Sequence, residues 1–180
     1  MRAVWTFALF PFLVAGCAGM MGSTSAATAT AELRNASGQV VGTATLTEVS
    51  GGVRMVLEMR GMAAGPKGVH VHEIGACEPP AFTSAGGHFN PHGRQHGTLN
   101  PQGPHAGDLP NITIAADGTG RLETMTDRVT LGSGPTSLFD ANGSAIVAHA
   151  GPDDFRTDPT GNSGGRAACG VIVRADARKS

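Results

Sequence analysis

Histidines are concentrated in one part of this chain, and their arrangement restricts the folds that the chain can adopt. Six of the seven histidines lie between residues 70 and 105. The first two belong to the segment Val69-His70-Val71-His72, whose alternation of apolar and polar residues is typical of a β-strand. Side chains two residues apart in a strand point to the same face, so His70 and His72 present neighbouring imidazoles while the valines face the other way. This pattern predicts a metal-binding face on a sheet.

Short alternating segments separated by turn residues predict an all-β domain. The segment Asp117-Gly118-Thr119-Gly120 is a clear hairpin signal, and no segment shows a convincing helical period. We therefore expect eight strands in an antiparallel sandwich or barrel of the immunoglobulin-like type. The expected strands are Thr28–Leu33, Val40–Val49, Val53–Met59, His70–Ile74, Ile112–Ala115, Arg121–Thr126, Ala145–Ala148 and Val171–Val173.

Two stretches, residues 75–110 and 150–168, are much longer than the usual connection between strands. Loops of this length in a compact domain are usually either functional or disordered. Both are interpreted here as functional loops, because the first carries most of the histidines and the second is rich in Gly, Asp and Pro.

The N-terminal residues have the pattern of an export signal. Residues 1–17 combine a charged start, a short apolar run and the exit Val14-Ala15-Gly16-Cys17, and the run is too short to span a bilayer. The exit looks like a bacterial lipobox, in which Cys17 is acylated; a plain secretory signal cleaved between Ala18 and Ala27 is the alternative. Residues 18–27 are predicted to form a flexible tether to a single domain at 28–180. Ala18 favours an anchor on the outer membrane, facing the periplasm.

Export changes how Cys77 and Cys169 are interpreted. An oxidising compartment favours a disulfide between them, and closing such a long loop stabilises a fold by roughly 2 to 5 kcal/mol in the entropic description. Zinc ligation by these two cysteines is the alternative, although no Cys-x-x-Cys spacing supports it.

The net charge of −1 and the absence of tyrosine leave no basic surface and few stacking platforms, so nucleic acid is not an expected partner.

The remaining polar residues suggest two metal sites. Imidazole suits copper and zinc, and three histidines with one carboxylate make a closed tetrahedral zinc site. The long loop supplies such a set in His88, His96, His105 and Asp108. His70 and His72, joined by His149 from a neighbouring strand, make a nitrogen-rich site suited to copper. One histidine at the boundary can serve both metals through its two ring nitrogens.

The order of these motifs carries a resemblance that extends over essentially the whole mature domain. The motifs are His70-Val71-His72-Glu73, Ser84 to Pro91, His96-Gly97, His105 to Pro110, Val147-Ala148-His149 and Gly161 to Val171. Together they resemble the copper-zinc superoxide dismutases of the bacterial exported type. The resemblance implies an eight-stranded flattened Greek-key barrel with two long functional loops.

The resemblance also implies roles for particular residues. It assigns copper to His70, His72, His88 and His149, and zinc to His88, His96, His105 and Asp108, with His88 shared as an imidazolate. It pairs Cys77 with Cys169, places Arg166 above the copper, and makes Asp153 the carboxylate that joins ligand histidines of the two metals. His92 matches no ligand position and is expected to be a solvated loop residue.

The implied reaction is the dismutation of superoxide to dioxygen and hydrogen peroxide. Arg166 is expected to attract the anion, and His88 is expected to pick up a proton and give it to the peroxide. A copper-binding or copper-delivering module of the same fold is the alternative function, but it is not expected to keep the shared histidine and the arginine. A zinc hydrolase is a third possibility, which the closed zinc ligand set disfavours. The chain is expected to be a monomer or a homodimer.

Overall fold

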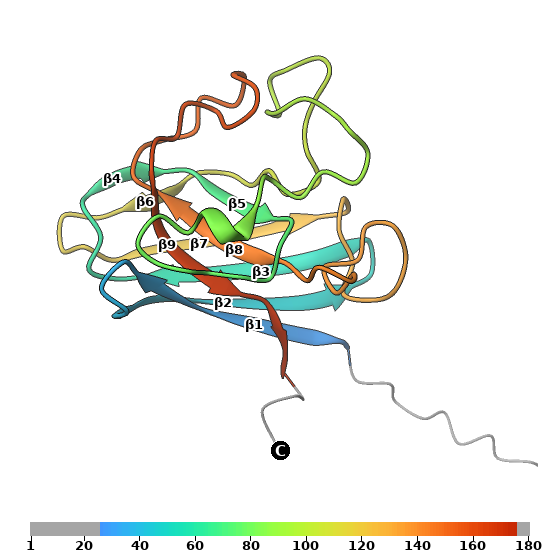
Figure 1. The fold of residues 1–180 in the computed structure, drawn as a ribbon, viewed down its shortest axis with the longest axis horizontal. Coiled ribbons are helices and arrows are strands. Elements are labelled where there is room, and N and C mark those ends of the chain that lie inside the picture. The colour runs from blue at the N-terminus through green and yellow to red at the C-terminus, as the bar shows by residue number, and fades with distance from the viewer. Residues whose placement is uncertain (1–25, 176–180) are drawn as a thin grey trace, which may run out of the picture.

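The structure is a computed structural model that describes residues 26–175, so the predicted signal at 1–17 and most of the predicted tether lie outside the described residues. The strands are β1 (Thr28–Asn35), β2 (Val40–Val49), β3 (Gly52–Met59), β4 (Gly65–Lys67), β5 (Val69–His72), β6 (Ile112–Ile114), β7 (Gly120–Thr126), β8 (Ala145–His149), β9 (Arg166–Val171) and β10 (Val173–Arg174). One short 3₁₀ helix, η1 (Thr83–Ala85), lies in the first long loop (Figure 1). Among the described residues, no helix is long and apolar enough to cross a membrane.

The strands form one antiparallel ladder that nearly closes into a barrel. Its order is β4-β6-β7-β3-β2-β1-β9-β8-β5. The two ends of this order, β4 and β5, are separated in the chain by Gly68 alone, so the ladder returns upon itself. Within it, β9-β1-β2-β3 has the Greek-key form, in which a later strand returns beside the first of three consecutive strands. The predicted all-β Greek-key barrel is confirmed.

The last strand differs from its expected position at Val171–Val173. The chain pairs with β8 from Arg166 onward, and the ladder breaks at Ile172, which is buried and donates its backbone N–H to Ser144 O. The residues between Arg166 and Gly170 are all small, so the sequence shows no alternation of polar and apolar residues from which a strand could be predicted there. The strand β4 was also missed, because Gly65 and Pro66 are poor strand formers.

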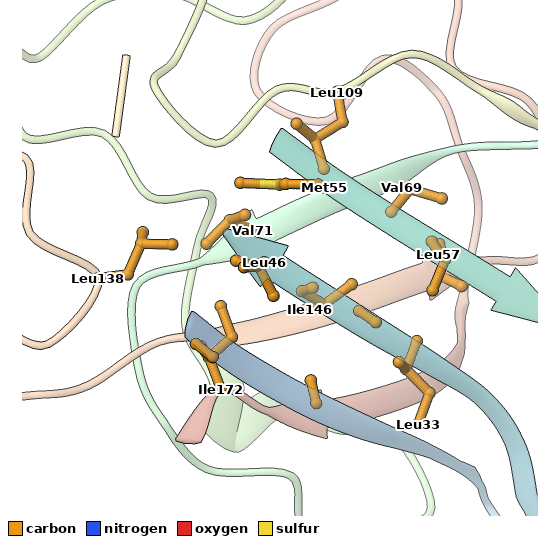
Figure 2. Packing of buried hydrophobic residues seen from close by; sticks show 14 of the residues in the cluster. Leu33, Leu46, Met55, Leu57, Val69, Val71, Leu109, Leu138, Ile146 and Ile172 are labelled. Atoms are coloured by element: carbon orange, nitrogen blue, oxygen red, sulfur yellow. The ribbon is translucent and has the colours of Figure 1, made fainter. Parts of the chain in front are cut away.

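The core is built by alternate residues of the strands (Figure 2). In β3, Val53, Met55, Leu57 and Met59 are buried while the residues between them are more exposed. Val69 and Val71 in β5 are fully buried in the same core, so the predicted alternation of this strand is confirmed. Each fully buried aliphatic side chain of this size contributes about 1.5 to 3 kcal/mol through the hydrophobic effect.

The two long loops project from the same end of the barrel (Figure 1) and touch each other. Leu99 N donates to Phe155 O at 3.0 Å, and His96 N donates to the Asp158 carboxylate at 2.6 Å. The first loop also covers the free edge of β5, where Val71 N donates to Gly107 O and Val71 O accepts from Phe89 N. His70 and His72 are therefore buried as well, although they lie on the face opposite to the core valines.

Candidate metal centre

Four buried histidines form the first group of ligands. His70 and His72 come from β5, His149 from β8 and His88 from the first loop, and one ring nitrogen of each lies within 4.8 Å of the others. Among the described residues, four buried ring nitrogens of this group have no hydrogen-bond partner, namely His70 Nδ1, His72 Nε2, His88 Nε2 and His149 Nε2. Buried polar atoms without a partner are unfavourable, so four in one place indicate a site built for a cation. Four imidazole nitrogens fit copper.

In His70, His72 and His149, the second ring nitrogen faces a hydrogen-bond acceptor that is fixed by the fold. His70 Nε2 lies 2.7 Å from Asp153 Oδ2. His72 Nδ1 and His149 Nδ1 each lie 3.1 Å from a backbone carbonyl, of Gly86 and Gly164 respectively. Such contacts fix the tautomer and the orientation of a ligand histidine, so the free nitrogens are directed toward a common point.

The first group is also neutral. Burial lowers the pKa of His70 to about 3, of His72 to about 2 and of His149 to about 4, and it lowers the pKa of His88 as well. Because metal ions bind the neutral imidazole, these side chains need not release a proton at neutral pH before they bind.

The second group gathers around the carboxylate of Asp108. Its Oδ1 lies 3.0 Å from His88 Nδ1, 3.0 Å from His96 Nδ1 and 3.3 Å from His105 Nδ1. Its Oδ2 accepts the backbone N–H groups of Gly97 and His105, both at 2.9 Å. The four residues that the sequence proposed for zinc thus lie around one carboxylate, and three imidazoles with one carboxylate fit a tetrahedral zinc ion. The set whose donor atoms all lie within 4.8 Å of one another contains His70 in place of His105, so His105 is the least tightly gathered of the four.

His88 belongs to both groups. Its Nδ1 faces Asp108, whereas its Nε2 is one of the four unpartnered nitrogens of the first group. Its ring stacks on that of His70 with 3.9 Å between the centroids. The two sets of donor atoms therefore share a single imidazole.

Asp153 connects the two groups from the second long loop. Its Oδ2 lies 2.7 Å from His70 Nε2 and its Oδ1 lies 3.0 Å from His96 Nε2. Its backbone is held by Asn111, which exchanges two hydrogen bonds with it at 2.9 Å. At Gly161, where φ is +64°, an added Cβ would lie 1.9 Å from Asp153 Oδ1, so this position requires glycine. Neither Asn111 nor Gly161 was predicted as a supporting residue, because no local pattern distinguishes them from other loop residues.

His96 differs from the histidines of the first group in its charge. Burial lowers the pKa of His96, but hydrogen bonds to Asp108 and Asp153 outweigh this effect and raise it to about 9. Hydrogen bonds with His105, His88 and His96 hold the pKa of Asp108 well below its usual range, despite burial. Hydrogen bonds with His70 and His96 do the same for the pKa of Asp153. In the absence of metal, a proton on His96 is therefore stabilised between two carboxylates.

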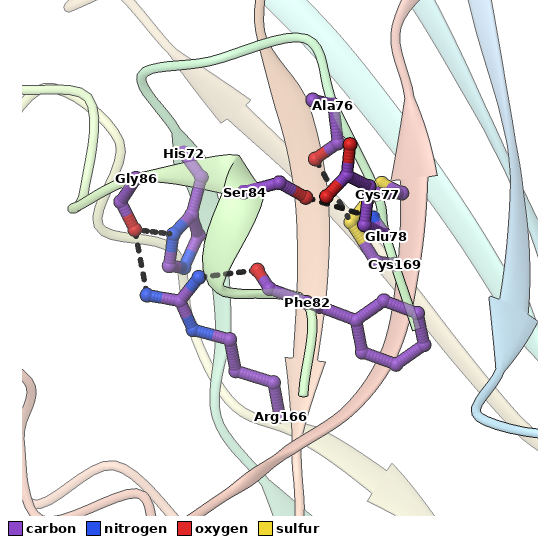
Figure 3. The surroundings of a disulfide bond; sticks show 9 residues. All are labelled: His72, Ala76, Cys77, Glu78, Phe82, Ser84, Gly86, Arg166 and Cys169. Carbon is purple, nitrogen blue, oxygen red and sulfur yellow. Dashed lines mark hydrogen bonds between the residues drawn. A yellow bond between two sulfur atoms is a disulfide. The ribbon is translucent and has the colours of Figure 1, made fainter. Parts of the chain in front are cut away.

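Arg166 lies beside His72 of the first group (Figure 3). Its Nη1 donates to Phe82 O and its Nη2 donates to Gly86 O, both at 2.6 Å. Gly86 O also accepts from His72 Nδ1, and the pairing of β8 with β9 sets Arg166 opposite His149. Burial lowers the pKa of Arg166, but a guanidinium stays charged at working pH. The structure thus places a fixed positive charge next to the unpartnered nitrogens.

The predicted disulfide is present and holds the segment that binds Arg166. Cys77 and Cys169 are bonded, with 5.6 Å between their Cα atoms and a separation of 92 positions in the chain. The bond joins the first loop to β9, three residues after Arg166 (Figure 3). Zinc ligation by these cysteines, the alternative left open by the sequence, is thereby excluded.

His92, the histidine expected to be a bystander, is exposed and belongs to neither group. Within residues 26–175 its side chain has no hydrogen bond or ion pair. Cys17, the proposed acylation site, lies outside the described residues.

Comparisons with known proteins agree with this geometry. Residues 40–172 match the family described as copper/zinc superoxide dismutase (SODC). The chain is 50% identical over 144 residues to superoxide dismutase [Cu-Zn] 2 of Aquifex aeolicus, covering 79% of this chain and 84% of that protein. It is 44% identical over 160 residues to superoxide dismutase [Cu-Zn] of Deinococcus radiodurans, covering 81% and 84%.

Solved structures show the same fold. A double mutant of a superoxide dismutase-like protein from Bacillus subtilis superposes with a TM-score of 0.77 at 39% identity, covering 79% of this chain and 95% of that one. The clock protein EA4 superposes with a TM-score of 0.70 at 36% identity, covering 84% and 96%. The resemblance found in the sequence is confirmed, and copper and zinc are the metals of the matched family: this chain belongs to the copper/zinc superoxide dismutases.

Proposed function

We propose that this chain dismutes superoxide, converting two superoxide anions and two protons into dioxygen and hydrogen peroxide. The observation that carries the proposal is the set of four buried, unpartnered imidazole nitrogens beside a fixed guanidinium. Copper, when bound, supplies a one-electron couple that alternately accepts an electron from superoxide and returns one to it, whereas zinc has no redox chemistry.

In this proposal His70, His72, His88 and His149 hold copper, and His88, His96, His105 and Asp108 hold zinc. The two nitrogens of His88 support its role as the shared ligand, because they face different groups. Its Nε2 can carry the proton that the peroxide product needs only when this nitrogen is not bound to copper, and we place the proton there in that state. Since no acceptor among the described residues competes for this nitrogen, a proton held there would be free to be passed on.

Arg166 binds and orients the substrate in the proposed mechanism. A positive charge in a narrow site focuses the field and raises the local concentration of a small anion. The two carbonyl contacts of Arg166 hold the guanidinium in place, so its position does not depend on the substrate.

The direct test is to purify the protein, determine copper and zinc per chain, and measure superoxide decay. We expect one copper and one zinc per chain and a rate approaching the diffusion ceiling, as is known for superoxide dismutases. Metal-free protein and an equal concentration of free copper are the controls. Protein that holds copper without accelerating superoxide decay would instead support the alternative function of copper binding or delivery.

We also propose that the protein is exported to the periplasm and anchored to the outer membrane through a lipid on Cys17. The disulfide supports export, because such bonds persist in oxidising compartments, and its pairing leaves Cys17 available. Cys17→Ser should move the protein from the membrane fraction to the soluble fraction without changing its activity per copper. A membrane fraction that does not change would refute the anchor.

A further inference from the structure

A second polar site lies between the first long loop and the chain that follows β7, and none of its lining residues carries one of the unpartnered ring nitrogens. It is a cleft of about 390 Å³. Its lining comprises His92, Arg94, Gly103, Pro104 and Ala106 from that loop, and Asp127, Arg128 and Thr136 from the chain that follows β7. The volume lies in the range of about 300 to 1,000 Å³ that is usual for small-molecule sites. We call it the Arg94–Arg128 cleft.

The charged side chains of this cleft are predominantly cationic. Arg94 and Arg128 contribute two guanidinium groups, and Asp127 is the single carboxylate in the lining. In the part of the chain that the structure describes, neither arginine forms an ion pair, and the Arg94 side chain has no hydrogen bond. Two like charges that line one cleft repel each other, and an anion between them relieves this repulsion.

Arg128 adds an unsatisfied donor. Its Nη2 donates to Asp108 O at 2.7 Å, which fixes the guanidinium against the loop. Its Nε, by contrast, is buried without a partner among the described residues. A buried donor of this kind is unfavourable unless a ligand or water accepts from it. The fork of a guanidinium matches the paired oxygens of a phosphate or carboxylate.

We propose that the Arg94–Arg128 cleft binds a small oxyanion, a phosphate or a carboxylate, through these two guanidinium groups. The site is separate from the proposed substrate site, because none of its lining residues belongs to the four-histidine group or contacts Arg166. An anion in this cleft would nevertheless contact Arg128, whose side chain donates a hydrogen bond to the backbone carbonyl of Asp108. Dismutation does not depend on this proposal.

Calorimetric titration of the metal-loaded protein with inorganic phosphate, and separately with succinate, tests the proposal at constant ionic strength. We expect saturable binding at this cleft for at least one of the two probes, in addition to any anion that Arg166 attracts, and the comparison identifies which chemistry is preferred. Arg94→Ala should weaken this binding about tenfold or more, as expected for the loss of a charged hydrogen-bond donor. Asp127→Asn should strengthen it, because the opposing carboxylate is removed.

Two control variants establish whether the anion binds in this cleft rather than elsewhere on the protein. Arg60→Ala removes the same charge from an exposed arginine outside the cleft and should leave the affinity unchanged. Arg166→Ala removes the guanidinium beside the histidines and should also leave binding intact. The proposal is overturned if neither probe binds, if Arg60→Ala weakens binding as much as Arg94→Ala, or if only Arg166→Ala abolishes it. Circular dichroism and melting temperatures verify that each variant is folded.

Discussion

The two groups of histidines share His88 but are built on different principles. In the first group, burial keeps the imidazoles neutral, and three of them are oriented by Asp153 or by backbone carbonyls. In the second group, one carboxylate contacts three rings, and the pKa of His96 is raised to about 9. The first group thus holds buried ring nitrogens that have no hydrogen-bond partner among the described residues. In the second group, a proton on His96 allows the ring to form hydrogen bonds with both neighbouring carboxylates.

This difference predicts how each group responds to perturbation. The free nitrogens of the first group remain positioned without metal, because β5 and β8 carry three of the four rings. The second group lies almost entirely in the first long loop and depends on Asp108 and on contacts with the second loop. We therefore expect the second group to be the more sensitive to single substitutions and to pH.

The largest effect is expected for Asp108→Asn. The substitution removes the negative charge around which three imidazoles gather, so zinc affinity should fall by at least about 100-fold, beyond the range seen when only outer contacts of a ligand are lost. Copper should remain bound, because His70, His72 and His149 are oriented by other acceptors. Metal content after dialysis measures both effects. Asp154→Asn, an exposed carboxylate in the neighbouring loop, is the matched control; equal zinc loss in both variants would contradict the prediction.

A pH titration of metal binding sharpens the comparison. At pH 7 the proton on His96 must be displaced by zinc, so zinc affinity should rise by up to about tenfold per pH unit and level off near pH 9. Copper affinity should stay nearly constant over this range, because burial has already lowered the pKa values of His70, His72 and His149 to about 4 or less. Competition with chelators of known affinity measures both slopes, and equal slopes would contradict the difference between the groups.

The proton on His96 also affects the stability of the metal-free protein, which should fall as the pH rises, whereas zinc affinity should increase. The pKa of His96 is raised above its ordinary value of 6.5, so its contribution to the stability of the metal-free protein is complete below pH 6.5 and is lost as the pH rises through about 9. The melting temperature of metal-free protein should therefore have a component that decreases from pH 6.5 to 9. His96→Gln should remove this component.

A smaller effect is expected for Arg166→Ala, which leaves both groups of ligands in place. Loss of the guanidinium should lower the rate of superoxide decay by about tenfold or more, within the range of electrostatic steering. The remaining activity should respond less to added salt, because salt screens the field of the charge over about 8 to 10 Å. Arg156→Ala, in the exposed part of the second loop, is the control. Full activity, or a loss explained by missing copper, would refute the role of Arg166.

The smallest effect is expected for His92→Ala. His92 and His96 lie in the same loop, but the first is exposed and the second is completely buried between two carboxylates. His92→Ala should keep its zinc and its activity, whereas His96→Ala should lose zinc and retain some copper. Zinc loss in His92→Ala would show that the assignment of ligands in this loop is shifted.

The sequence by itself determined the features that are local or that depend on residue type. The alternation of Val69 to His72 predicted a strand with valines in the core and histidines on the other face, as the structure shows. The nitrogen and oxygen donors, their order along the chain and the two cysteines predicted the metals and the disulfide. These predictions succeeded because a strand has a period of two and because metals select their ligands by chemistry.

Only the tertiary structure decided which residues support these ligands. Asn111 contacts Asp153 from 42 positions earlier, and Phe82 O accepts from Arg166 across 84 positions. Gly161 is required because its φ is positive and because Asp153 and His96 pack against it. The strand β9 begins at Arg166 because β8 offers a partner there. None of these contacts leaves a periodic pattern in the sequence. They arise because closing the barrel brings two long loops together, and the geometry of that closure is a property of the whole chain.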